Sequence, residues 1–161
     1  MVPIKNHPIA KTIHKPTKPV ALVKPKYRYT EAIGRRKTAM VRVRVYEAKH
    51  ADALMHGIVV NDKKYEAYFP LKREQKIAAA PLTALSLGEK DYAVSVHAKG
   101  GGVNAQAEAV CLGLARALIA IDPTRRTKLK ALGFLKRDPR MVERKKYGSR
   151  KARRPQQWRK R

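Results

Sequence analysis

The positive charge of this chain is concentrated at its two ends. Residues 136–161 contain 13 Lys and Arg against two acidic residues, and residues 1–26 contain six Lys, five Pro and no acidic residue. Residues 27–135 carry a more balanced 19 basic and 10 acidic side chains. Segments so charged and so poor in apolar residues bury too little surface to offset the entropy of ordering. The sequence therefore predicts a folded domain at 27–135, a basic Pro/Lys-rich arm at 1–26 and an extended basic tail at 136–161.

The charge of the whole chain predicts an anionic partner. Its 161 residues have a formal net charge of +26, and self-repulsion of this size destabilises an isolated compact chain. A membrane is disfavoured, because the tail cannot form an apolar helix face and the longest apolar stretch, Ala105–Ile121, is short and contains charged residues. We therefore predict a nucleic acid, and RNA rather than duplex DNA, since irregular RNA offers crevices and unstacked bases.

The two charged segments have different patterns. Residues 1–26 have neither the apolar stretch of a secretory signal nor the Arg and Ser of a transit peptide, so we interpret them as an extended basic arm. The tail is interrupted by Pro139, Gly148 and Pro155 and has no helical periodicity, which favours an extended chain whose arginines pair with phosphates. Trp158 either stacks on a base or is a lone aromatic on a tail.

Alternating residues predict strands in the domain at Thr38–Tyr46 and Tyr92–Ala98. In the first strand the inward face is Val41, Val43 and Val45, and the outward face is Met40, Arg42, Arg44 and Tyr46. In the second, Tyr92, Val94 and Val96 share one face. Asn61-Asp62 is a turn signal within Ile58–Phe69, which predicts a short hairpin or a strand and loop.

Apolar residues at helical spacing predict a long helix that opens at Asn104, a candidate N-cap, and stops at Pro123. Its apolar positions are Ala107, Val110, Leu114, Leu118 and Ile121, and Arg116 points outward. Cys111 lies in this pattern, which favours a small buried residue over a nucleophile. Shorter helices are predicted at Leu71–Ala80 and Pro123–Leu132. Strands and helices in this order predict an α+β fold, with helices packed on one face of a single sheet.

Two stretches of the domain are candidate phosphate contacts. Lys99–Gly102 joins a strand to the long helix, where glycine N–H groups and a helix N-terminus can hold a phosphate, or where glycines merely allow a tight turn. It is not a Walker A loop, and Ala105 breaks a G-x-G-x-x-G pattern. Gly34–Lys37 precedes the first predicted strand, and its cations are either solvated or in contact with phosphate, which the total charge favours.

The sequence offers little for catalysis. None of the five His has metal-binding spacing, a single Cys excludes an internal disulfide, and no triad or nucleophile elbow is present. His97 is a polar strand residue in our interpretation. Asp138 and Glu143 are embedded in the basic tail, where we expect them to orient arginines rather than to form an acid/base pair. We predict that the chain is not an enzyme and has no cofactor or metal.

Three segments together resemble the family of the ninth protein of the small ribosomal subunit, in its bacterial or organellar form. They are GRRKTAMVRVRV at Gly34–Val45, KGGGVNAQAEAVCLGLARALIAID at Lys99–Asp122 and GFLKRDPRMVERKKYGSRKARRPQQWRKR at Gly133–Arg161. The resemblance runs from about Tyr27 to the C-terminus, and RDPRMVERKKYG and KARRPQQ are its most specific parts.

The resemblance implies a left-handed βαβ ribosomal-protein fold and binding to ribosomal RNA in the head of the small subunit, beside neighbouring ribosomal proteins. It implies that the tail runs toward the peptidyl site, where Lys160 and Arg161 approach the anticodon-stem backbone of tRNA. The location is then the ribosome, cytoplasmic or in a mitochondrion or chloroplast, with no membrane and no small-molecule substrate.

The predicted site residues follow from the charge pattern, the glycine loop and the family resemblance together. The residues predicted to bind ribosomal RNA are Arg35, Arg36, Lys37, Arg42, Arg44, Lys99, Gly100, Gly101, Gly102, Arg137, Arg140, Arg144, Lys145, Lys146, Arg150, Lys151, Arg153 and Arg154. The residues predicted to contact tRNA are Trp158, Arg159, Lys160 and Arg161.

The chain departs from the family at three places. Ala105 stands where the family usually has Gly, and Trp158-Arg159 stands where it usually has Phe-Ser, so the added cation strengthens or shifts the tRNA contact. The arm at 1–26 has no counterpart in the typical short form.

Two other functions stay open from the sequence. A non-ribosomal RNA chaperone or nucleoid protein shares the charge but is expected to bind duplex DNA about as well as structured RNA. An enzyme that uses the glycine loop on a phosphorylated substrate is the second alternative, although no catalytic group supports it.

Overall fold

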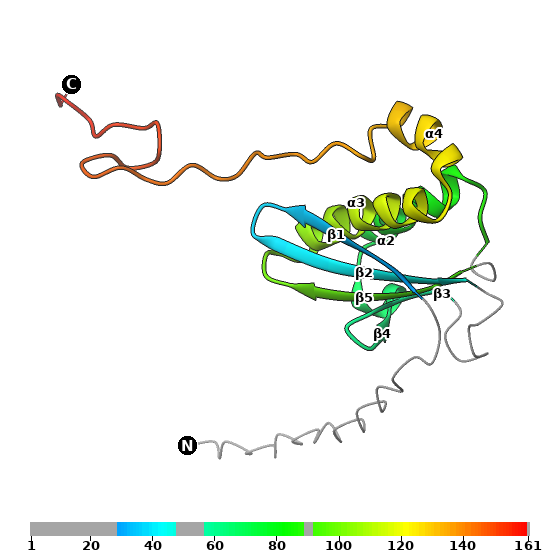
Figure 1. The fold of residues 1–161 in the computed structure, drawn as a ribbon. Helices are drawn as coiled ribbons and strands as arrows, with labels where there is room; N and C mark the ends of the chain where they lie inside the picture. The colour runs from blue at the N-terminus through cyan, green and yellow to red at the C-terminus, as the bar shows by residue number, and fades with distance from the viewer. Residues whose placement is uncertain (1–28, 48–56, 89–91, 161) are drawn as a thin grey trace, which may run out of the picture.

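Among the described residues, five strands form one mixed sheet in the order β1-β2-β5-β3-β4 (Figure 1). The computed structural model describes residues 29–47, 57–88 and 92–160. The strands are β1 (Thr30–Arg36), β2 (Ala39–Glu47), β3 (Gly57–Val60), β4 (Lys63–Lys64) and β5 (Tyr92–Lys99). The helices are α1 (Tyr65–Tyr68), α2 (Lys72–Ala84), α3 (Val103–Ile121) and α4 (Arg126–Ala131), with the 3-10 turn η2 (Pro123–Arg125) before α4. Helix α3 packs on β1 and β2, and α2 packs beside α3, which confirms the α+β prediction.

The predicted alternation in β2 and β5 builds the core. Val41, Val43 and Val45 are at most 1% exposed, and each lies opposite an apolar residue of β5. Leu114 and Leu118 of α3 cover them and are fully buried. Burial of a side chain of this size stabilises the fold by about 1.5–3 kcal/mol. The helix-facing side of the sheet therefore supplies most of the stability of the domain.

One outward position of β2 differs from the prediction. The alternation places Tyr46 on the outer face with Arg42 and Arg44, but Tyr46 is only 5% exposed. Its ring centroid lies 5.7 Å from that of Tyr29, in a tilted aromatic pair. Contact between neighbouring side chains on the outer face therefore buries a residue that the period-2 pattern assigns to solvent.

Helix α3 begins one residue earlier than predicted, at Val103. Its N-cap is Gly102, and no side chain caps the helix, so the prediction of Asn104 as N-cap is wrong. Gly100 and Gly101 have positive φ angles of 74° and 67°, and this turn brings Gly102 into the extended conformation of a cap residue.

By length and composition α3 can cross a membrane, but 67% of that stretch is buried inside the protein, as expected of a core helix.

The sequence does not predict β1, which pairs antiparallel with β2 from Thr30 to Arg36. The segment TEAIGRR has no clear alternation, and tertiary packing fixes it as a strand. A Cβ on Gly34 would lie 1.8 Å from the carbonyl oxygen of Ala109 in α3, so only glycine allows this close approach. The basic cluster at 34–37 is therefore the end of β1 and the turn to β2, rather than a segment before the first strand.

Strands β3 and β5 pair in parallel, and the connection between them contains β4, α1 and α2. This parallel pair joined through helices is the βαβ element that the family resemblance implies.

The β3–β4 hairpin turns at Asn61 and Asp62, both at positive φ, as the turn signal predicts. Helix α2 continues past its predicted end at Ala80 to Ala84, with Pro81 inside it. The predicted helix at Pro123–Leu132 is η2 followed by α4.

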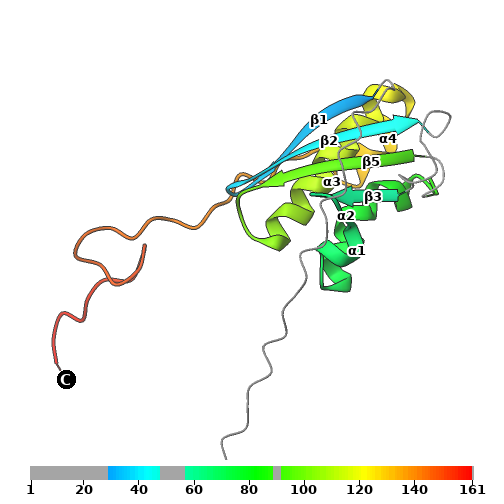
Figure 2. The ribbon, with the colours of Figure 1, turned by 90° about the horizontal axis from the view of Figure 1, so that it is seen from below.

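Beyond α4 the chain extends away from the domain (Figures 1 and 2). In both views it passes the end of the sheet at which β1 turns into β2 and continues well past it. The residues from Lys136 to Lys160 form no helix. The predicted arm at 1–26 lies outside the described residues, and the division of the chain at Lys26 and Leu135 stays a prediction.

Candidate nucleic-acid interface

The far part of the tail folds back into a loop. The carboxylate of Glu143 accepts two hydrogen bonds from Arg153, at 2.8 Å from Nε and 2.6 Å from Nη2. Ser149 and Pro155 form an isolated antiparallel bridge, and the N–H of Arg150 donates to the carbonyl oxygen of Arg154 at 2.8 Å. Arg153 lowers the pKa of Glu143, so this carboxylate is charged at neutral pH. The tail is therefore extended near the domain and closed by an ion pair farther out.

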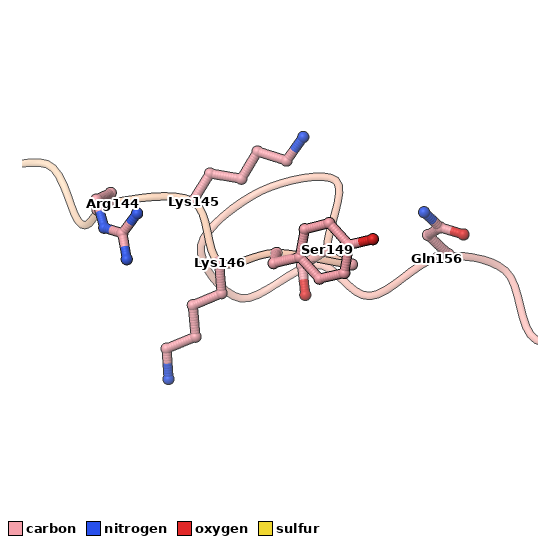
Figure 3. Close-up of a pocket in the computed structure, with 7 residues that line it drawn as sticks. Arg144, Lys145, Lys146, Ser149 and Gln156 are labelled. Atoms are coloured by element: carbon pink, nitrogen blue, oxygen red, sulfur yellow. The ribbon is translucent and has the colours of Figure 1, made fainter.

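This loop surrounds a shallow, open hollow of about 520 Å³ (Figure 3). Its lining residues are Arg144, Lys145, Lys146, Tyr147, Gly148, Ser149 and Gln156, with no acidic residue among them. Figure 3 shows Lys145 and Lys146 on opposite sides of the backbone, as expected for neighbours in an extended chain. Cationic and hydroxyl donors of this kind suit an anion with several oxygens, such as a phosphate.

The outer face of the sheet, which no helix of the described part covers, carries a second group of cations. Arg42 lies opposite Ile33 on β1 and His97 on β5, and Met40 lies between Arg35 and Lys99 in the next row. Ile33 and Met40 are 43% and 49% exposed. A shallow hollow of about 290 Å³ opens there, lined by Ile33, Met40, Val41, Arg42, His97 and Lys99. This face combines exposed apolar surface with donors.

One arginine of that face is already paired within the chain. Arg44 donates from Nε to Glu31 at 2.9 Å and lies over the Tyr29 ring, 4.9 Å from its centroid. The hydrogen bond to Glu31 raises the pKa of Arg44. Arg42 is more exposed, with its Nε 3.9 Å from the same carboxylate. Of the two, Arg42 is therefore the freer donor for an external phosphate.

The glycine loop before α3 has a structural explanation. A Cβ on Gly100 would lie 2.7 Å from the carbonyl oxygen of Thr38, and one on Gly101 would lie 2.8 Å from the Cβ of Ala39. Both residues also need positive φ. The side chain of Gln106 holds the loop from inside by donating to the Gly100 carbonyl at 3.0 Å. The turn is thereby explained without a ligand, and its predicted contact with RNA stays a prediction.

Arg36 is held inside the chain. Its side chain is only 13% exposed, and it forms ion pairs with Glu108 and Asp138 at 2.5 and 3.1 Å. Its Nη1 also donates to the carbonyl oxygen of Arg140 at 2.6 Å. Of all the cations predicted to bind RNA in the described part of the chain, Arg36 has its donors most fully occupied by partners within the protein.

The tail carboxylates behave as the sequence predicts, since each binds an arginine. Asp138 accepts from the backbone N–H of Arg140 at 2.9 Å and from its guanidinium, in addition to the pair with Arg36. The hydrogen bonds from Arg140, assisted by the charge of Arg36, lower the pKa of Asp138 to about 2. Glu143 binds Arg153. The sequence did not reveal Glu108 as a partner, although it is the single acidic residue of α3.

The remaining candidates within the described residues lie on the surface. Exposed members are Arg35, Lys37, Lys99, Arg137, Arg150, Lys151, Arg154, Trp158, Arg159 and Lys160, whereas Arg161 lies outside the described residues. Trp158 is 99% exposed and Tyr147 is 105% exposed, so both present a whole ring to solvent. Sequence reasoning missed Tyr147, although an aromatic residue directly after Lys145-Lys146 is a signal for base stacking.

Nothing in the described residues supports catalysis. They contain no group of three His, Cys, Asp or Glu side chains that could hold a metal ion. Cys111 is buried in α3, and burial raises the pKa of its thiol to about 12, so it remains protonated at neutral pH. This agrees with the interpretation of Cys111 as a small core residue.

The model of the ribosomal protein S9/S16 family matches residues 34–161, which is most of the chain. The chain belongs to this family. Among similar proteins, the small ribosomal subunit protein uS9 of Desulfovibrio desulfuricans is 48% identical over 128 residues, which cover 80% of this chain and 93% of that protein. The uS9 proteins of Lawsonia intracellularis and Mycobacterium tuberculosis are each 44% identical, over 83% and 81% of this chain and 97% and 82% of theirs.

Family membership confirms two predictions, and the extent of the matched region shows which part of the chain the family covers. The resemblance drawn from three segments is confirmed, since the matched region contains all of them. The family consists of structural ribosomal proteins, which confirms that the chain is not an enzyme. The match begins at Gly34, within β1, so the arm at 1–26 lies outside the matched region.

Proposed function

We propose that the chain binds the ribosomal RNA of the small-subunit head through its basic outer sheet face and tail, and that the end of the tail contacts peptidyl-site tRNA. The observation that carries this proposal is the tail itself. It projects from the domain and presents a loop lined by Arg144, Lys145 and Lys146 without an acidic side chain in the lining. A segment that exposes nearly all of its cations suits an extended polyanion.

The coarser assignment rests on the family. The chain is a structural constituent of the small ribosomal subunit and associates there with ribosomal RNA and proteins. The similar proteins cited above are bacterial, and bacterial ribosomes are cytoplasmic. A mitochondrial or chloroplast ribosome is the alternative location in this proposal.

The mechanism is electrostatic and positional. The domain folds around its own core, and its exposed cations meet the phosphate backbone, which releases condensed counterions. Arginine forks pair with phosphate oxygens two at a time, and Trp158 and Tyr147 are available to stack on unpaired bases. The last residues, Arg159 to Arg161, then lie at the end of the tail, where the proposal assigns the tRNA contact.

The ribosomal RNA assignment is tested by partner choice. Binding of the full chain to an RNA fragment of the small-subunit head is compared with binding to duplex DNA of equal length and charge at the same salt concentration. The proposal expects clearly tighter binding to the RNA, together with co-sedimentation with small subunits in high salt. Equal affinity for both, and loss from the subunit in high salt, would point to a general nucleic-acid-binding protein instead.

The tRNA contact is tested separately, on assembled particles. Deletion of Lys160 and Arg161 is expected to leave folding and subunit assembly intact and to speed the dissociation of peptidyl-site tRNA. The matched control replaces Lys128 and Lys130 with Gln, which removes two cations from exposed positions of α4 and leaves the tail intact. An unchanged tRNA dissociation rate in the truncated particle would reject the tRNA contact and leave the RNA assignment standing.

A further inference from the structure

Arg36 lies where the sheet, the core helix and the tail meet. It is the last residue of β1, on the face that packs against α3, and its Nε donates to Glu108 of α3 at 2.5 Å. Its other two nitrogens reach the tail, one to the Asp138 carboxylate at 3.1 Å and one to the Arg140 carbonyl oxygen at 2.6 Å. One guanidinium therefore joins three segments that are far apart in the sequence.

The tail has few other attachments at this point. In the part of the chain that the structure describes, the ion pairs and hydrogen bonds between residues 136–160 and the sheet all involve Arg36. The tail passes the β1–β2 end of the sheet at this place, and beyond it the side chains of Met141 and Val142 are 53% and 90% exposed. Arg36 thus marks the place where the tail leaves the domain.

The guanidinium of Arg36 suits a fixed connection between the domain and the tail, which we call the junction. A guanidinium is planar and permanently charged, and its donors point in fixed directions, so three acceptors can hold it in one orientation. Asp138 is shared between Arg36 on one side and the guanidinium and N–H of Arg140 on the other. With its side chain 13% exposed, Arg36 is also shielded from competing water and salt more than a surface pair is.

We propose that Arg36, together with Glu108 and Asp138, is a positioning group that fixes the direction in which the tail leaves the domain. This group holds the tail against the domain as far as Arg140. The loop at 143–155 then lies at a defined distance from the outer sheet face. A tail fixed at its base loses less freedom when it binds than one free from Lys136 onward. Arg36 itself then contacts no RNA. The consequence for RNA binding rests on the proposed function, but the junction does not.

The test uses substitutions for which positioning and simple electrostatics predict opposite results. Glu108→Gln replaces the charged acceptor of the Arg36 Nε by a neutral amide, which weakens this contact, and makes the chain more positive. If charge alone governed binding, this variant would bind RNA at least as tightly as the parent chain. The junction predicts weaker binding, by about 3- to 10-fold, because the tail must be ordered on binding. Glu66→Gln is the matched control, since Glu66 is an exposed acidic residue on α1, far from the junction in the fold.

The direct readout needs no RNA. Backbone amide relaxation of the full chain in solution is expected to show Asp138 and Arg140 as rigid as the domain in the parent protein and in Glu66→Gln. In Glu108→Gln and in Arg36→Gln they are expected to become as mobile as the residues beyond Met141, while the thermal midpoint shows that the domain remains folded. Arg73→Gln, at an exposed position of α2, controls for the loss of one cation.

The outcomes separate the two hypotheses. Unchanged relaxation at Asp138 and Arg140 in both junction variants would overturn the positioning role, whatever the affinity for RNA. RNA binding by Glu108→Gln as tight as by Glu66→Gln would overturn the link between junction and binding. Changed relaxation in a chain whose parent form fails to bind the RNA fragment would support the junction and reject the proposed function.

Discussion

In the domain Val41, Leu114 and Leu118 are fully buried, whereas in the tail Val142, Tyr147 and Trp158 are 90–105% exposed. The charge is divided in the same way, since 27–135 carries nine more basic than acidic side chains over 109 residues and 136–161 carries eleven more over 26. Contacts within the chain determine the domain, and the tail leaves most of its side chains for something outside. Folding and binding therefore depend on different parts of the sequence.

The tail nevertheless has some structure of its own. Its two acidic residues each pair with an arginine, Asp138 at the junction with Arg36 and Glu143 across the loop with Arg153. The exposed pair of Glu143 with Arg153 contributes little stability, so we assign it to shape rather than to folding. The pair of Asp138 with Arg36 is less exposed and attaches the tail to the domain. Contacts within the chain therefore shape both regions, but they determine much more of the domain than of the tail.

The largest effect is expected in the core. Leu118→Ala removes a fully buried side chain against the sheet and should lower the free energy of unfolding by about 2–5 kcal/mol. Val142→Ala, in the tail, should change it by less than about 0.5 kcal/mol. Urea unfolding followed by circular dichroism measures both. A similar loss for the two variants would mean that the tail belongs to the folded unit.

A smaller effect is expected where β1 approaches α3. Gly34→Ala places a Cβ 1.8 Å from the Ala109 carbonyl oxygen, so strand and helix must separate, at a cost of about 1–3 kcal/mol. Gly148→Ala is the tail counterpart, because no atom lies within 4 Å of its Cβ position and only its positive φ of 77° opposes the substitution. The same unfolding experiment should show a loss in the first variant alone. Equal stability of Gly34→Ala and the parent chain would contradict the close packing of β1 on α3.

The smallest effect is expected from protonation of Asp138. Its pKa is lowered from 3.8 to about 2 in the folded chain, so its pairing is complete above about pH 4 and is lost as the pH falls toward 2. Amide relaxation at Arg140 should therefore show increasing mobility over this range, ahead of global unfolding. Asp138→Asn should show the mobile behaviour already at neutral pH. A tail base that is equally rigid at pH 5 and pH 2 would exclude Asp138 as its anchor.

The sequence predicts the part of the fold that depends on local pattern. Apart from the buried Tyr46, the alternation in β2 and β5 is confirmed, as are the helical spacing in α3 and the turn at Asn61 and Asp62. Each is a regular arrangement of neighbouring residues. Strand β1 is missed because it is held by pairing with β2 and by the approach of Gly34 to α3, and neither is visible in TEAIGRR. The N-cap at Asn104 is wrong for a related reason, since the preceding glycines set where the helix begins.

The candidate interface is predictable as a charge pattern but not as a set of free and occupied cations. Arg35 and Arg36 are neighbours in one basic cluster, yet Arg35 is exposed and Arg36 is held by Glu108 and Asp138. The strand places them on opposite faces, and that strand was not predicted. The sequence did predict that Asp138 and Glu143 orient arginines. It did not show that Arg153 is the partner of Glu143, because the loop brings together residues ten positions apart.

The central claim is that the cations of the tail carry the affinity for RNA while the domain positions them. The most direct measurement is the salt dependence of the observed binding constant for an RNA fragment of the small-subunit head, for the full chain and for a chain that ends at Val142. The shorter chain keeps the junction at Arg36 and lacks ten Lys and Arg. The full chain should lose about 10³- to 10⁵-fold in affinity between 50 and 200 mM salt, as expected when about six to ten phosphates are neutralised, and the shorter chain should lose far less. Equal salt dependence of the two chains, with both domains folded, would contradict the account.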